Sequence, residues 1–133
     1  MKADFTVVSN FLNCTNEKEA RALTESCNSS MVISALADRN GSFVQVSNNV
    51  TNVFGCSESE LKENHETVFS MTHDDEKGEI FRAYSSVLLD GSAFRLLQHI
   101  HCRKIGRTPV VTHLKRIIGD NNKDMVLCLN IRA

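Results

Sequence analysis

The pattern of apolar and polar positions predicts two strands early in the chain, helices in the middle and three strands at the end. Residues 31–37 form an apolar run of strand length, and residues 43–47 combine apolar with interleaved polar side chains. Asn40-Gly41 lies between these runs and favours a type I′ turn, because both central residues of that turn have positive φ. This stretch is therefore predicted to be a β-hairpin.

Helical spacing of apolar residues replaces strand spacing after the hairpin. A short helix is expected to end at Gly55, and Ser57 with Glu60 forms a capping box that begins the next helix. A longer helix is expected from about residue 73, where acidic side chains suit the helix N-terminus, to Asp90-Gly91. The middle of the chain is thus predicted to be helical.

The final third predicts three strands, over residues 94–102, 109–118 and 125–131, separated by glycine-containing turns. Before the hairpin, residues 17–27 predict a helix, and the apolar residues within 1–15 are expected to cover the sheet or a partner. Strands at both ends of the domain with helices gathered between them predict an α+β fold whose sheet is antiparallel.

Several short motifs follow one another in a characteristic order and spacing. The motifs are Asp38-Arg39-Asn40-Gly41, Val46-Ser47-Asn48, Phe54-Gly55, Ser57-Glu58-Ser59-Glu60-Leu61 and Thr72-His73-Asp74-Asp75. Together they resemble the PAS domain. The resemblance covers residues 28–133, nearly the whole chain, and we place the domain at 29–133, with 1–28 as an N-terminal extension and flanking helix. In the last motif Asp74 stands where the family usually has Pro.

The resemblance implies a five-stranded antiparallel sheet of order 2-1-5-4-3, with helices on one face and a flanking helix at the N-terminus. It also implies a sensory and protein-interaction module that mediates homo- or heterodimerisation in a signalling or transcription-regulating protein. The expected partner is a second copy or another PAS domain. The resemblance further implies that a small apolar ligand could bind between the sheet and the helices.

Length and composition suit one soluble domain. The chain has 133 residues and is 41% hydrophobic, and no run approaches the ~20 apolar residues of a membrane helix. No signal-like segment opens the sequence, so we expect an intracellular protein, in the cytoplasm or nucleus. The five cysteines lack C-x-x-C spacing and are expected to be free thiols.

Charge is distributed unevenly although the net charge is only −1. Residues 1–90 contain 7 Lys and Arg against 14 Asp and Glu, whereas residues 91–133 contain 8 against 2. One interpretation is that mixed charges simply solvate the domain. The other is that two complementary surfaces favour head-to-tail or antiparallel association. The net charge disfavours direct nucleic-acid binding by this domain.

None of the common catalytic motifs occurs in the sequence, and we predict a non-enzymatic protein without a metal site. His99 and His101 share one strand face, near His113 on the expected neighbouring strand. Three imidazoles suit zinc or haem, but the strand phase favours a polar outer face that meets a partner. The predicted interface residues are Leu23, Arg95, Leu97, His99, His101, Arg103 and His113.

A set of mostly apolar residues is expected to lie between sheet and helices. Either they are simply the core, or they surround a small apolar ligand oriented by Tyr84, Gln98 and Asn130. The set comprises Ile33, Val44, Val46, Phe54, Leu61, Val68, Phe81, Tyr84, Leu88, Leu96, Gln98, Ile100, Cys128 and Asn130.

No cofactor is predicted. The alternative is a light, gas or redox sensor domain that binds flavin or haem, and the sequence does not exclude it. PAS domains that form a flavin–cysteine adduct carry a motif similar to residues 62–69, but here His65 stands in the place of the reactive Cys. The arginines that hold the flavin phosphate are missing as well. Asn130 falls where those domains carry an inward Gln, and the helix over 76–89 lacks the His that haem-binding members often use.

Overall fold

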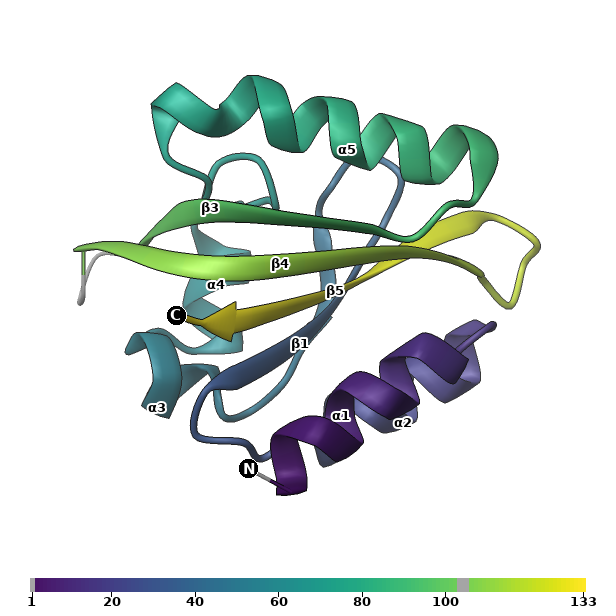
Figure 1. Ribbon diagram of the computed structural model, residues 1–133, viewed down its shortest axis with the longest axis horizontal. Helices are drawn as coiled ribbons and strands as arrows, with labels where there is room; N and C mark the ends of the chain where they lie inside the picture. The colour runs from purple at the N-terminus through teal and green to yellow at the C-terminus, as the bar shows by residue number, and fades with distance from the viewer. Residues whose placement is uncertain (1, 103–105) are drawn as a thin grey trace.

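The computed structural model describes the backbone of residues 2–102 and 106–133, and the side chains of residues 6–101 and 106–133. Five strands form one antiparallel sheet of order β2-β1-β5-β4-β3, which confirms the α+β topology expected from the sequence (Figure 1). The elements are α1 (Lys2–Asn13), α2 (Glu17–Ser26), β1 (Val32–Ala37), β2 (Phe43–Val46), α3 (Val50–Phe54), α4 (Glu58–Glu63), η1 (Asp74–Glu76), α5 (Lys77–Asp90), β3 (Phe94–Cys102), β4 (Gly106–Ile118) and β5 (Asp124–Arg132).

Helices pack on both faces of the sheet. We call the face beneath α3, α4 and α5 the inner face, and the opposite face, which meets α1 and α2, the outer face (Figure 1). Alternation along β5 supplies both layers, because Cys128 belongs to the inner cluster while Leu127 and Leu129 belong to the outer cluster. The flanking segment therefore contains two helices rather than one, and both contribute buried residues to the outer cluster.

The loop between β1 and β2 differs from the predicted type I′ turn. Only Gly41 has positive φ in this loop, at 84°, and the Asp38 N–H donates to the Ser42 carbonyl across 3.0 Å. The Asp38 carboxylate also accepts hydrogen bonds from the N–H groups of Asn40 and Ser42, at 2.9 and 3.0 Å. The side chain of Asp38 thus stabilises a longer loop, which the Asn-Gly signal alone does not specify.

Local capping fixes several helix boundaries. The Ser57 Oγ accepts from the Glu60 N–H at 3.1 Å, which confirms the predicted capping box at the start of α4. The Asn16 side chain caps α2 by accepting from the Glu19 N–H at 2.9 Å. Helix α5 ends at Gly91 with a φ of 76°, as its position after Asp90 predicts. Among the described helices, none has both the length and the apolar character needed to cross a membrane.

Candidate functional site

A chain of four polar side chains, three of them buried and Asn130 partly buried, crosses the inner face of the sheet. The Thr72 hydroxyl donates to Gln98 Oε1 at 3.0 Å, and Gln98 Nε2 donates to the Thr112 hydroxyl at 2.8 Å. The Thr112 hydroxyl in turn donates to Asn130 Oδ1 at 2.6 Å. Gln98 is only 2% exposed, so these hydrogen bonds offset the cost of burying its amide within an otherwise apolar layer.

A cavity of about 30 Å³ lies against this polar chain. Three of its lining residues, Gln98, Thr112 and Asn130, belong to the chain, and Cys128 adds a thiol. Phe43, Val68, Met71 and Ile100 complete the wall. The volume suits a water molecule and is far below the ~300–1,000 Å³ of ordinary small-molecule pockets.

The predicted pocket residues divide into two groups. Buried or partly buried members of the inner cluster include Ile33, Val46, Phe54, Leu61, Tyr84, Leu88 and Leu96, but none of these seven lines the cavity. Those that line it are Val68, Gln98, Ile100, Cys128 and Asn130. The sequence interpretation missed Phe43, Met71 and Thr112, although the alternation of β4 places Thr112 between the inward Val110 and Leu114.

Two pocket predictions were wrong. Val44 packs against the outer cluster, because an irregularity in the β1–β2 register leaves it as an extra residue between Phe43 and Gln45. Phe81 is 60% exposed on α5, and its ring centroid lies 5.7 Å from that of Phe69, so it does not line the core.

Tyr84 is also unsuited to the expected role of orienting a ligand. Its hydroxyl donates to the Asp38 carbonyl, and the phenol belongs to the buried inner cluster. Burial raises the pKa of Tyr84, because the ionised phenolate would lose its hydration. Tyr84 therefore ties α5 to the β1–β2 loop.

The cavity that the described residues enclose on the inner face does not fit flavin or haem. Close packing of the inner cluster leaves the 30 Å³ cavity beside the polar chain, much smaller than either group. Burial raises the pKa of the Cys128 thiol to about 12, so that thiol is neutral near physiological pH. The described residues also contain no group of three or more His, Cys, Asp or Glu side chains placed to hold a metal ion.

The outer face is divided into a covered half and an open half. On the covered half, α1 and α2 pack over Leu36, Leu127 and Leu129, which are fully buried. The open half lies on paired positions of β3 and β4, where Leu97 is 64% exposed. It consists of Arg95, Leu97, His99, His101, Arg107, Pro109 and Val111.

Five of the predicted interface residues lie on or next to the open half, and one does not. Leu23 is 6% exposed within the outer cluster, so it cannot contact a partner without displacement of α2. His113 lies at the border, where its ring contacts Phe11 edge-on with 6.0 Å between centroids. Burial and the positive charge of Arg95 lower the pKa of His113. Arg103 lies outside the described residues.

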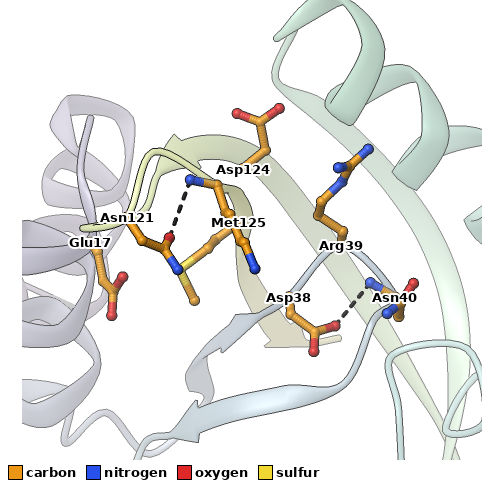
Figure 2. A pocket seen from close by; sticks show the side chains of 8 residues that line it. Glu17, Asp38, Arg39, Asn40, Asn121, Asp124 and Met125 are labelled. Atoms are coloured by element: carbon orange, nitrogen blue, oxygen red, sulfur yellow. Dashed lines mark hydrogen bonds between the residues drawn. The ribbon is translucent and has the colours of Figure 1, made fainter.

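A polar cleft that the sequence interpretation missed opens at one end of the sheet (Figure 2). The β1–β2 loop, the β4–β5 turn and the start of α2 form it, and its volume is about 390 Å³. Glu17 Oε1 accepts from the Asp120 N–H at 3.0 Å and Glu17 Oε2 accepts from Arg21 Nε at 2.6 Å, which together lower the pKa of Glu17. Glu17 thus connects α2 with the β4–β5 turn. The lining residues are Glu17, Asp38, Arg39, Asn40, Asn121, Lys123, Asp124 and Met125.

No protein-family model matches the sequence, and a comparison with curated proteins finds no match. Solved structures show that the chain has the PAS fold. The PAS-B domain of Drosophila melanogaster Cycle, with bound ethylene glycol, superposes with a TM-score of 0.67 at 12% identity, covering 77% of this chain and 100% of that one. The PAS domain of an HTR-like protein from Haloarcula marismortui gives 0.66 at 17% identity, covering 87% and 90%. A domain of a sensor histidine kinase/response regulator from Geobacter sulfurreducens gives 0.59 at 13% identity, covering 86% and 91%.

Proposed function

We propose that this PAS-fold domain is a protein-interaction module of a signalling or transcription-regulating protein, not an enzyme, and that the open half is its docking surface. The observation that carries the proposal is Leu97, which is 64% exposed on a sheet face that also carries Arg95 and Arg107. None of the described outward residues of β3 and β4 is acidic. Exposed apolar surface with a polar rim is typical of interaction sites.

The charge of the open half favours an acidic partner surface. A second copy of the chain offers one on α4, where Glu58, Glu60 and Glu63 accompany a single Lys62. Association of the open half with α4 of another copy is heterologous, and its strength falls as salt screens the charges. The sensor histidine kinase/response regulator among the structurally similar chains supports this general role.

Sedimentation velocity over a concentration series tests the proposal. We expect reversible self-association of the wild-type chain that weakens between low and high salt and is lost in Leu97→Asp and Arg95→Glu. Leu89→Asp is the matched control, because Leu89 is 84% exposed on α5, away from the open half. Loss of association in Leu89→Asp with retention in Leu97→Asp would contradict the proposed surface, as would a wild-type chain that stays monomeric throughout.

A second candidate function is binding of a small polar molecule beside the polar chain, where the cavity of about 30 Å³ would widen to admit it. The polar chain favours a polar ligand over the apolar ligand expected from the sequence, because three amide and hydroxyl side chains of the polar chain line the cavity wall. NMR titration with ethylene glycol would test it. We expect shifts confined to inner-face amides around Thr112 and reduced in Thr112→Val, whereas shifts scattered over the surface would contradict the candidate.

A further inference from the structure

Residues 67–76, which we call the strap, cover part of the free edge of β3. The His73 N–H donates to the His99 carbonyl at 2.8 Å, and the His101 N–H donates to the Met71 carbonyl at 2.7 Å. An antiparallel bridge joins Thr72 to Ile100 between these two hydrogen bonds. The strap thus adds a short extra pairing at an edge that is otherwise free to bind another strand.

The strap is also one wall of the cavity. Val68 and Met71 both line it, and the Thr72 hydroxyl reaches Gln98 at the end of the polar chain. The opposite wall is the sheet itself, through Cys128 and Asn130 of β5. Movement of the strap away from β3 would expose Cys128 without separating any pair of sheet strands.

One carboxylate fastens the end of the strap to β3. Glu76 Oε1 accepts from the His99 N–H at 2.9 Å and lies 2.9 Å from His99 Nδ1. The Glu76 and His99 side chains are 20% and 33% exposed, so solvent reaches this contact. Helix α5 behind it is fixed by Ile80, Tyr84 and Val87, each at most 1% exposed. These edge contacts hold the strap to β3, while its Val68 and Met71 side chains pack in the inner cluster and close the cavity.

We propose that the strap is the gate of the inner cavity and that the Glu76–His99 contact is its latch. Release of Glu76 lets the strap leave β3 and admits small neutral molecules to the polar chain and Cys128, while the sheet stays folded. The proposal deepens the second candidate function, because it gives the cavity a route to solvent. It is independent of the docking surface on the outer face.

Chemical labelling of Cys128 measures the opening directly. Methyl methanethiolsulfonate is small and neutral. The thiolate attacks its divalent sulfur and forms a methyl disulfide, while the bond to the sulfonyl sulfur breaks and methanesulfinate leaves. Mass spectrometry of peptides reads each cysteine separately at a fixed pH. Cys27, which is 4% exposed in the outer cluster, reports unfolding of the whole domain in the same sample.

We expect Glu76→Ala to accelerate labelling of Cys128 by about tenfold or more, since charge-assisted hydrogen bonds hold the latch. The rate at Cys27 should stay unchanged. Glu79→Ala is the matched control: it removes an exposed carboxylate from the first turn of α5, and it should change neither rate. Thr72→Val removes the hydrogen bond between the strap and Gln98, and it should also accelerate labelling of Cys128 but not of Cys27.

Three results would overturn the gate. Equal acceleration of Cys27 and Cys128 in Glu76→Ala would mean that the whole domain is destabilised. An unchanged rate of Cys128 labelling in that variant would show that the Glu76–His99 contact does not hold the strap closed. Equal acceleration in Glu79→Ala would show that the effect is not specific to Glu76. Because labelling needs no bound ligand, the gate can be confirmed even if ethylene glycol does not bind, and the two proposals therefore fail separately.

Discussion

The two halves of the outer sheet face have the same backbone geometry and opposite surroundings. On the covered half, Leu127 is fully buried under α1 and α2. On the open half, Leu97 is 64% exposed on a face that also carries Arg95 and Arg107. Strand alternation decides which side chains point to the outer face, but only the N-terminal helices decide which of them are removed from water. A surface leucine on the open half is therefore available for binding, whereas its counterpart on the covered half stabilises the fold.

The largest expected contrast comes from the same substitution made on both halves. Leu127→Asp buries a carboxylate among apolar side chains and is expected to cost more than about 4 kcal/mol, a large part of the ~5–15 kcal/mol that stabilises a typical domain. Leu97→Asp changes an exposed position and is expected to cost less than about 0.5 kcal/mol. Urea denaturation followed by circular dichroism measures both. Similar losses in the two variants would mean that the halves do not differ in packing.

A second, smaller effect is expected where α1 meets the sheet. Phe11 is 1% exposed and contacts His113, while Lys115 Nζ donates to the Phe11 and Leu12 carbonyls at the end of α1. Phe11→Ala should destabilise the docked helix by about 3 kcal/mol and speed amide exchange throughout α1. Leu12→Ala, at a residue that is 57% exposed, is the control and should have little effect. Equal exchange in both variants would show that Phe11 does not anchor α1.

The smallest effect concerns pH at the border between the halves. Burial first, and Arg95 second, lower the folded-state pKa of His113 below its ordinary value of 6.5, so the folded domain disfavours the protonated ring. The unfolded chain then binds more protons than the folded one, and stability falls as pH decreases below about 6.5 towards the lowered pKa. His113→Gln should show a shallower loss over that interval in urea titrations. An identical pH dependence of the two proteins would contradict the assignment.

Particular residues show how far the sequence defines this molecule. The phase of β3 was predicted correctly, because Gln98 and Ile100 are buried whereas Leu97 and His101 are exposed. The register irregularity that turns Val44 outward leaves no clear periodic signal in a four-residue strand. The size of the cavity cannot be predicted from the sequence pattern, because it depends on how Phe43 and Met71 fill the space beside the polar chain.

The N-terminal helices show a second limit. The apolar residues within 1–15 predict coverage of the sheet or a partner, and the structure places Val7 and Phe11 in the outer cluster. A single sequence does not specify how far that coverage extends across β4 and β3. The open half is therefore defined only once the chain has folded, although the basic charge of the last third is compatible with an acidic partner as well as with simple solvation.

The central claim is that the open half is where this domain binds protein. Its most direct test is a series of two-dimensional NMR spectra of the wild-type chain over increasing concentration, at low salt. We predict that the amide signals that shift belong to the β3 and β4 residues of the open half and to α4, and that high salt reverses the shifts. Shifts confined to α5, around Phe81 and Leu89, or no shifts at any concentration, would contradict the claim.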